Sequence, residues 1–485
     1  MKPKMTRRAL ILSGIFLLSF SLSNAQVVLN EFSAANYNNY DLGGEFEDWV
    51  EFYNPSGSTV DISGYFLSDD PTDPEKWAIP AGFTVAAGGY RVVLLSGTFD
   101  YDPGFLGQTN TSFKVTQTAE ENIVFSNPIG VILENYDFAV DADDGITPNQ
   151  ANHSWGRDVN GTGNWVVYTN PTPGAANGAG NGVRYAARPQ LSIEAGYYAS
   201  SQNVTLTTPE PNSTIYYTLN GDEPTNGSTL YTGPISITST SVIRAIVYSN
   251  DPNILPGFIE TNTYFIGDAH EIMAVSISGS TLSDGSWGWG GGTGEFTHIE
   301  FFDENGTFLA EAQGDSNEHG NDSNAYDQRG FDYITRDALG YDNEVEYPVI
   351  SSTDRPSYER LIFKAAANDN YSFAGGAHLR DAYVHELSLI GGLRLDERKT
   401  EFSVLYINGD YWGVYDIREK VDDIDFTDYY YDQPEGFVDF IKTWGGTWNE
   451  YGSNADWQDL VTFITTNDMS IQANYDYVLT QYNTM

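Results

Sequence analysis

Basic and acidic side chains that could handle phosphate groups concentrate between residues 360 and 425. Lys364 ends an apolar run, Arg380 and Glu386 follow within a segment of helical spacing, and Glu419 precedes an acidic turn. Phosphoryl transfer needs cations on the phosphates, an acid that holds one of these cations, metal-binding carboxylates and a base near the acceptor hydroxyl. The candidate metal ligands share the acidic turn: Asp422, Asp423 and Asp425.

Three kinds of element must position these groups. The run RLIFK at 360–364 reads as a strand, and the apolar residues of 379–390 recur near helical spacing. Two further strands, FSVLYI and GVYDI, flank Asn408-Gly409, which is a strong hairpin signal. The second of these strands runs directly into the acidic turn.

The segments LYINGDYWGVYDIREKVDD, HLRDAYVHELSLIGGLRLDER and HGNDSNAYDQRGFDYITRDALGYDNEVEYP resemble the CotH (spore coat protein H) kinase-like family. The similarity covers roughly residues 267–485, with several segments matching in order. It implies an α+β kinase-like domain, ATP with Mg or Mn as cofactors, and phosphorylation of a protein acceptor.

One position departs from the family pattern. In the family this region often ends in a lysine-bearing strand that meets the nucleotide phosphates, whereas here the match falls on Arg329. Arginine can hold phosphate bidentately but is a different group from lysine. Either Arg329 substitutes, or Lys364 takes the role, or the site does not transfer phosphoryl groups. Glu386 would then fix the cation, Arg380 would add a phosphate contact, and Glu419 would lie at a cleft wall.

Each of these residues also has a structural interpretation. Lys364 fits a solvated strand lysine, Glu386 fits a surface pair with Arg380 or Lys399, and the aspartates fit an acidic turn or helix start. The glycine-rich stretch at 283–296 lacks the GxxxxGK[ST] pattern and lies far ahead of Lys364. We therefore favour an exposed loop over a phosphate-binding loop there.

The amino terminus predicts export. Four basic residues precede the apolar run ALILSGIFLLSFSL, and Ser23-Asn24-Ala25 supplies a small-residue cleavage site. A membrane anchor is the alternative, but the run has roughly fourteen residues, short of the ~20 that a spanning helix needs. We expect residues 1–25 to be a signal peptide and the protein to be secreted or on the cell surface, with no transmembrane segment in the mature chain.

The amino-acid composition limits the classes of partner that the protein can bind. With 67 acidic against 23 basic residues and a formal net charge of −44, the surface repels nucleic acid and anionic membranes. It suits a salty medium, with dedicated calcium sites as the weaker alternative. Cysteine is absent, which excludes disulfides and thiolate zinc sites.

Residues 26–177 read as an all-β domain of short strands and turns. The segments NEF, DWVEFYNP, GYFLSDD and PTPGAAN resemble a lamin tail domain, which implies an immunoglobulin-like β-sandwich that binds or spaces. Four polar residues of this domain could form a cation-binding or catalytic cluster: Asn30, Glu31, Asp48 and Glu51. We favour the alternative, in which they lie at strand ends and turns and form hydrogen bonds there.

A linker at 178–187 leads to a second all-β region at 188–266. Its segment IYYTLNGDEPTNGSTLYTGPISI resembles the small β-sandwich at the carboxy end of chitobiases and hexosaminidases. Tyr216, Tyr217 and Tyr231 could stack on a sugar, but alternation puts Tyr216 and Tyr217 on opposite faces, so we expect at least one in the core. Paired carboxylates of glycosidase type are not evident, so the resemblance does not imply hydrolysis.

After the acidic turn the sequence predicts a strand at VDFIK and helices over 454–466 and 470–482, and it stops at Met485. The family carries further helices and catalytic aspartates, so we expect the catalytic residues beyond residue 485 and a kinase-like domain that is incomplete at its C-terminus.

The sequence thus predicts a multidomain chain with two immunoglobulin-like sandwiches followed by a truncated α+β kinase-like domain at 267–485. The expected function is ATP- and metal-dependent phosphorylation of an extracytoplasmic protein or cell-surface acceptor. The alternative is a non-catalytic adhesion or polysaccharide-binding protein.

Overall fold

The computed structural model describes residues 27–40, 46–97, 109–118, 122–137, 149–282, 294–320, 328–340, 342–366, 369, 376–393, 395–421, 424–433, 439–443 and 445–482. The expected signal peptide and most of the glycine-rich stretch lie outside these ranges. Within them, the structure contains no helix with the length and apolar character needed to cross a membrane.

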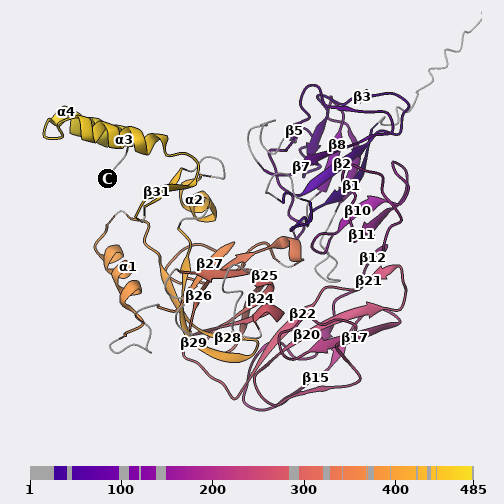
Figure 1. Cartoon of the computed structure of the whole chain (residues 1–485). Helices are drawn as coiled ribbons and strands as arrows, with labels where there is room; N and C mark the ends of the chain where they lie inside the picture. Colours follow the sequence, from indigo (N-terminus) through magenta and orange to yellow (C-terminus); the bar gives the residue numbers. More distant parts are fainter. Residues whose placement is uncertain are drawn as a thin grey trace, which may run out of the picture.

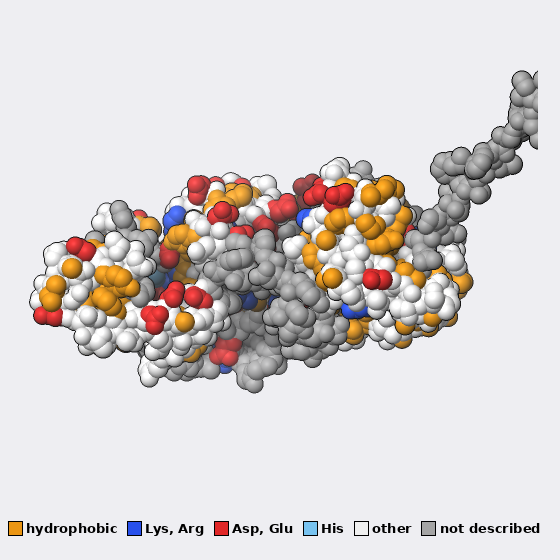
Figure 2. All heavy atoms as spheres, turned by 90° about the horizontal axis from the view of Figure 1, so that it is seen from above, with side chains coloured by type: hydrophobic (Ala, Val, Ile, Leu, Met, Phe, Trp, Pro, Cys, Tyr) orange, Lys and Arg blue, Asp and Glu red, His pale blue; other side chains and the backbone are white. Residues whose placement is uncertain are grey.

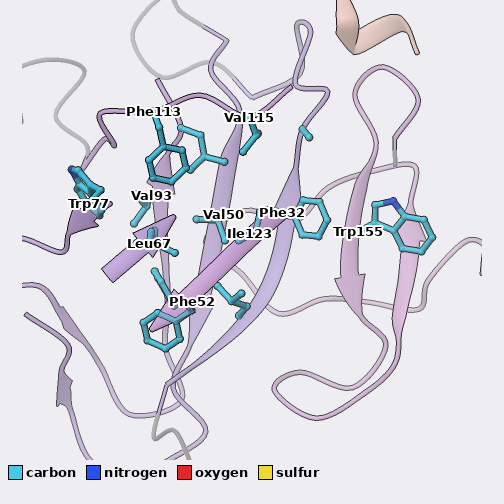
Figure 3. Close-up of a cluster of buried hydrophobic side chains, with 14 of the residues drawn as sticks. Phe32, Val50, Phe52, Leu67, Trp77, Val93, Phe113, Val115, Ile123 and Trp155 are labelled. Carbon is cyan, nitrogen blue, oxygen red and sulfur yellow. The ribbon is translucent and has the colours of Figure 1, made fainter. Parts of the chain in front are cut away.

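The first domain packs two antiparallel sheets face to face (Figure 1). Strand order is β11-β10-β1-β2-β7 in one sheet and β5-β4-β8-β9 in the other, and β3 pairs with β6. Phe52 of one sheet lies in the core (Figure 3). Its ring centroid is 4.9 Å from that of Phe125 in the other sheet. The strands are β1 (Val28–Ser33), β2 (Trp49–Tyr53), β3 (Val60–Asp61), β4 (Phe66–Ser68), β5 (Trp77–Ala78), β6 (Thr84–Val85), β7 (Tyr90–Leu94), β8 (Asn122–Ser126), β9 (Ile132–Asp137), β10 (Ser154–Arg157) and β11 (Trp165–Tyr168).

The second domain is also built from β-sheets around one core. Its main sheet has the order β14-β22-β20-β17-β18, and the pairs β15-β19, β13-β16 and β12-β21 complete the domain. Tyr217 and Tyr231 pack against the core, whereas Tyr216 contacts Tyr248 edge to face on the other side of the sheet. The expectation that one of the tyrosines is a core residue is therefore confirmed. The strands are β12 (Arg184–Tyr185), β13 (Gln190–Leu191), β14 (Gly196–Tyr198), β15 (Gln202–Val204), β16 (Leu206–Thr207), β17 (Ser213–Thr218), β18 (Thr229–Leu230), β19 (Ile235–Ile237), β20 (Ser241–Ser249), β21 (Ile254–Leu255) and β22 (Glu260–Ile266).

The third part is a closed barrel with the strand order β23-β24-β25-β26-β27-β29-β28. Neighbouring strands are antiparallel except β23 and β28, which run parallel and close the barrel. The barrel interior is apolar and includes Phe331 and Phe363, whose rings stack at 4.5 Å. The strands are β23 (Met273–Ser278), β24 (Gly294–Phe302), β25 (Phe308–His319), β26 (Gly330–Thr335), β27 (Arg360–Lys364), β28 (Thr400–Ile407) and β29 (Asp410–Glu419), and 3-10 turns lie at Ser280–Leu282 and Asp337–Leu339.

The Asn408-Gly409 hairpin is confirmed between β28 and β29. Both residues have positive φ, 51° and 86°, as a type I′ turn requires. At Gly409 a Cβ would also lie 3.1 Å from the Cα of Ser241, so the turn approaches the second domain closely.

Helices lie outside the barrel rather than within it (Figure 1). The expected helices are α1 (Arg380–Ile390), α3 (Ala455–Thr466) and α4 (Gln472–Tyr482), and α2 (Ile424–Tyr431) follows the acidic turn. The predicted strand at VDFIK is β30 (Phe440–Thr443), paired with β31 (Thr447–Tyr451). The described residues are therefore mostly β, with two sandwiches and a barrel.

Candidate functional site

Lys364 contacts an acid of helix α1, but this acid is not the one that we expected. Its Nζ donates to Oδ2 of Asp381, which lies in the first turn of the helix. Glu386 lies one and a half turns further on and is exposed. In the structure Lys364 thus pairs with Asp381 rather than with Glu386, and a role of Glu386 in nucleotide binding stays a prediction.

Arg418 shares the same carboxylate. One guanidinium nitrogen donates to Asp381 Oδ2 at 2.7 Å and the other to Asp416 Oδ2 at 2.6 Å. In the ladder Lys364 faces Asp416, and Arg418 lies two residues further along β29, so all three project from the outer face of the barrel. We call Lys364, Asp381, Asp416 and Arg418 the β27–α1 cluster.

The charges and burial within the cluster shift the pKa values of its two aspartates in opposite directions. Partial burial alone would raise the pKa of Asp381, but the hydrogen bond from Lys364 and the charge of Arg418 outweigh it and hold that pKa far below its usual value. Burial raises the pKa of Asp416, against the opposing effect of Arg418. Arg418 is fully buried, and its Nε has no hydrogen-bond partner among the described residues. The cluster thus contains a desolvated cation with an unused donor.

Arg380 belongs to the start of the same helix. Asp369 accepts from the backbone nitrogens of Ala377, Leu379 and Arg380 at 2.8–2.9 Å and from Arg380 Nε at 3.0 Å. These backbone hydrogen bonds, with the charge of Arg380, lower the pKa of Asp369 to about 2. Asp369 therefore anchors the helix N-terminus, and the Arg380 side chain stays 64% exposed.

Arg329 lies at the same end of the barrel as Lys364. It directly precedes β26, and its carbonyl accepts from the Tyr415 hydroxyl at 2.8 Å. The next residue, Gly330, lies against β27, where a Cβ would be 3.0 Å from the Phe363 carbonyl oxygen. Both candidate cations for the phosphates thus occur within one region.

Glu419 is in a different place. It lies at the end of β29, is 2% exposed, and accepts from the Tyr430 hydroxyl at 2.8 Å. Burial raises its pKa. Arg355 reaches both Glu419, at 3.8 Å, and Asp425, which lies in the first turn of α2. Glu419 and Asp425 therefore form an internal group with Arg355 that does not include Lys364.

Of the three expected metal ligands, the structure describes Asp425. Asp422 and Asp423 lie outside the described residues, and Asp425 pairs with Arg355. In the parts of the chain that the structure describes, no group of three or more His, Asp or Glu residues is placed to hold a metal ion.

In the first domain, Asn30, Glu31 and Glu51 belong to a buried hydrogen-bond network. Glu31 accepts from Ser154 and Thr172, and Glu51 accepts from Asn30 at 2.9 Å and from the Gly174 amide at 2.6 Å. Burial raises the pKa of Glu51 to about 8. This network fastens the segment 172–177 over β1 and β2, which supports the structural interpretation, whereas Asp48 lies apart and bonds the Asn36 amide.

Two cavities flank helix α1. One of about 450 Å³ lies beside Leu379, Phe402 and Tyr411, and the other, of about 250 Å³, includes Glu386 and Lys399. No residue of α1 is buried, so the helix is held mainly through the β27–α1 cluster and Asp369.

Sequence reasoning missed Asp369, Asp416 and Arg418. The Asp416-x-Arg418 pattern places opposite charges on one face of a strand next to the lysine strand, and it was the available signal. Asp369 left none, because the backbone N–H groups that it accepts from lie eight to eleven residues further along the chain.

Residues 317–481 match the family model described as CotH kinase protein. The whole β27–α1 cluster lies inside this match. Residues 21–144 match the lamin tail domain, and residues 193–253 match the chitobiase/beta-hexosaminidase C-terminal domain. All three resemblances found in the sequence are thereby confirmed. No curated protein shows significant similarity to the chain.

Proposed function

We propose that the CotH kinase region binds the phosphates of a nucleoside triphosphate beside β27 and α1, as the nucleotide-binding part of a kinase that phosphorylates a hydroxyl of an extracytoplasmic protein. The observation that carries this proposal is the ion pair between Lys364 and Asp381, joined by Arg418. The kinase-family match of the surrounding residues makes a kinase-like function the best supported one.

The residues fit a phosphate ligand. Lys364 is 24% exposed and Arg380 is 64% exposed, so a ligand can reach both cations from solvent, whereas Arg418 is fully buried and acts only through Asp381. Lysine and arginine are the side chains that neutralise phosphate oxygens in such sites. A bound nucleotide would supply the transferable phosphoryl group.

Asp381 is the positioning residue in this proposal. Because its pKa is far below neutrality, it stays ionised and holds the Lys364 ammonium at the end of β27. Arg418 fixes the other side of the same carboxylate. The lysine is thus oriented before a ligand arrives, which reduces the ordering cost of binding.

The carboxylates that the structure describes do not form a binding site for a metal ion. Asp425 is engaged by Arg355, so we assign no ligand for Mg, Mn or Ca and derive no step through a metal.

Titration with a fluorescent ATP analogue in the presence of Mg tests the proposal. Lys364→Met should weaken binding by about 10- to 100-fold, since one charged contact contributes ~1.5–3 kcal/mol. Lys442→Met is the matched control, because Lys442 pairs with Glu450 at 3.0 Å on the β30–β31 hairpin. Saturable binding that Lys364→Met and Lys442→Met reduce equally would contradict the assigned site.

The rival function is non-catalytic adhesion to a cell surface or polysaccharide, and the chitobiase-like match is what favours it. Retention on polysaccharide without saturable nucleotide binding would support the rival. Both proposals assume export by the amino-terminal signal predicted from the sequence.

A further inference from the structure

The larger of the two cavities beside helix α1 adjoins the β27–α1 cluster. Its volume is about 450 Å³, and apolar side chains line most of it. Phe402, which lines the cavity, pairs with Asp416 in the β28–β29 ladder, and Asp416 pairs with Lys364 in the β27–β29 ladder. Paired residues project from the same face of a sheet, so all three lie side by side on the outer face of the barrel.

Val414 shows how close the cavity lies to the cations. It lines the cavity and precedes Asp416 by two residues on β29, so both side chains project from the same face, about 7 Å apart along the strand. A ribose can bridge such a separation between a base and its first phosphate. An apolar cavity that adjoins a group of cations therefore suits the apolar part of a phosphorylated ligand.

His378 adds a polar group to this cavity. Its side chain forms a hydrogen bond with the Val414 carbonyl, whereas its Nε2 is buried and has no hydrogen-bond partner among the described residues. The bond to the carbonyl thus belongs to Nδ1, which must carry a hydrogen to donate. Burial lowers the pKa of His378, against the opposing charges of Asp416 and Asp369, so at pH 7 the ring is neutral and Nε2 is an acceptor.

The backbone holds His378 in an unfavourable conformation. Its φ is 58°, in the left-handed region that residues with a side chain rarely adopt. Its amide donates to the Asp369 carbonyl at 2.9 Å, and the Ala377 and Leu379 amides donate to the Asp369 carboxylate. These hydrogen bonds keep the imidazole at the cavity although the backbone is strained, a combination that is common at ligand sites.

We propose that this cavity takes the adenine base of the nucleotide and that His378 selects this base by accepting a hydrogen bond from its 6-amino group. The inference rests on the proposed function, because the neighbouring cations would hold the phosphates of the same molecule. Adenine supplies the donor that Nε2 lacks. Guanine carries a further carbonyl and a ring N–H, which would be unpaired among Leu379, Phe402 and Val414.

NMR titrations of the full chain with separate parts of the ligand test this assignment. Adenosine should bind about tenfold more tightly than purine riboside, which lacks only the 6-amino group, since one hydrogen bond is lost. His378→Ala should weaken adenosine binding about tenfold and change the binding of purine riboside and tripolyphosphate less than about twofold. Equal weakening of both nucleosides by His378→Ala would overturn the selection by His378, as would equal affinities of the parent protein for the two nucleosides.

Val414→Trp is the second variant, should His378→Ala fail to fold. Val414 is 37% exposed on the outer face of the barrel, so the larger ring would fill the cavity and should abolish adenosine binding. Val131→Trp, at a 52% exposed position of the first domain, is the matched control and should bind adenosine as the parent does. Unchanged adenosine binding by Val414→Trp would contradict a base in this cavity.

Tripolyphosphate separates this inference from the proposed function. Lys364→Met should weaken the binding of tripolyphosphate and leave that of adenosine unchanged. Adenosine binding without any effect of Lys364→Met on tripolyphosphate would overturn the phosphate site alone. Tripolyphosphate binding that depends on Lys364, without adenosine binding, would overturn the base site alone, and binding of neither probe would overturn both.

Discussion

The buried network of the first domain and the β27–α1 cluster are both built around carboxylates, but the partners of these carboxylates differ. Glu31 and Glu51 receive hydroxyl, amide and backbone donors, and burial raises their pKa values. Asp381 receives two cations, and its pKa falls. Neutral donors in a closed site hold a fold together, whereas cations gathered on one half-exposed acid can also serve an anionic ligand.

The two regions also differ in how the apolar side chains around them are packed. The first-domain network lies beside a packed core, whereas helix α1 carries exposed hydrophobic side chains. Figure 2 shows that hydrophobic side chains reach the surface at both ends of the molecule. Tyr383, Val384 and Ile390 of α1 are each more than 60% exposed.

The largest effect should come from breaking the closed network. Glu51→Ala leaves the Gly174 N–H without its acceptor and removes one of the acceptors of the Asn30 amide, which should cost about 2–4 kcal/mol of unfolding free energy by urea denaturation. Glu51→Gln is the control and should cost less than about 1 kcal/mol at pH 6, because the native carboxyl is then largely protonated. Equal losses would mean that the network depends on charge after all.

A smaller effect is expected at the second region. Asp381→Ala leaves buried Arg418 short of one partner, but Asp381 is 46% exposed, so water screens the loss. We expect about 1–2 kcal/mol, seen as faster amide hydrogen exchange confined to α1. Glu386→Ala should change the free energy of exchange in α1 by less than about 0.5 kcal/mol. A larger loss for Glu386→Ala than for Asp381→Ala would instead indicate that Glu386 is the partner of Lys364.

The two regions should also respond to pH in opposite directions. Asp381 and Asp369 have lowered pKa values, so their stabilisation is present above about pH 4 and is lost as the pH falls toward 2. Glu51 has a raised pKa, so its contribution is lost as the pH rises through about 8. Hydrogen exchange followed by mass spectrometry should therefore show faster exchange in α1 first at pH 3 and in the first domain first at pH 9. Loosening of both regions in acid alone would be inconsistent with this assignment.

Local signals in the sequence predicted much of the fold near the site. The Asn408-Gly409 turn, the β27 strand and helix α1 were found because turn chemistry and spacing are short-range properties. The partner of Lys364 was not, since it depends on which turn of α1 lies over β27. Barrel closure was also missed, because β23 and β28 pair in parallel across more than a hundred intervening residues and leave no local pattern.

Barrel closure determines which piece of the chain can be produced alone. The kinase-family match begins at residue 317, near the end of β25, whereas the barrel begins with β23 at Met273. A fragment cut at residue 317 would lose β23, β24 and most of β25, and β26 and β28 would become open edges. Open edges of this kind invite pairing with other chains and aggregation. Expression from the residues before β23 would keep the ring of strands intact.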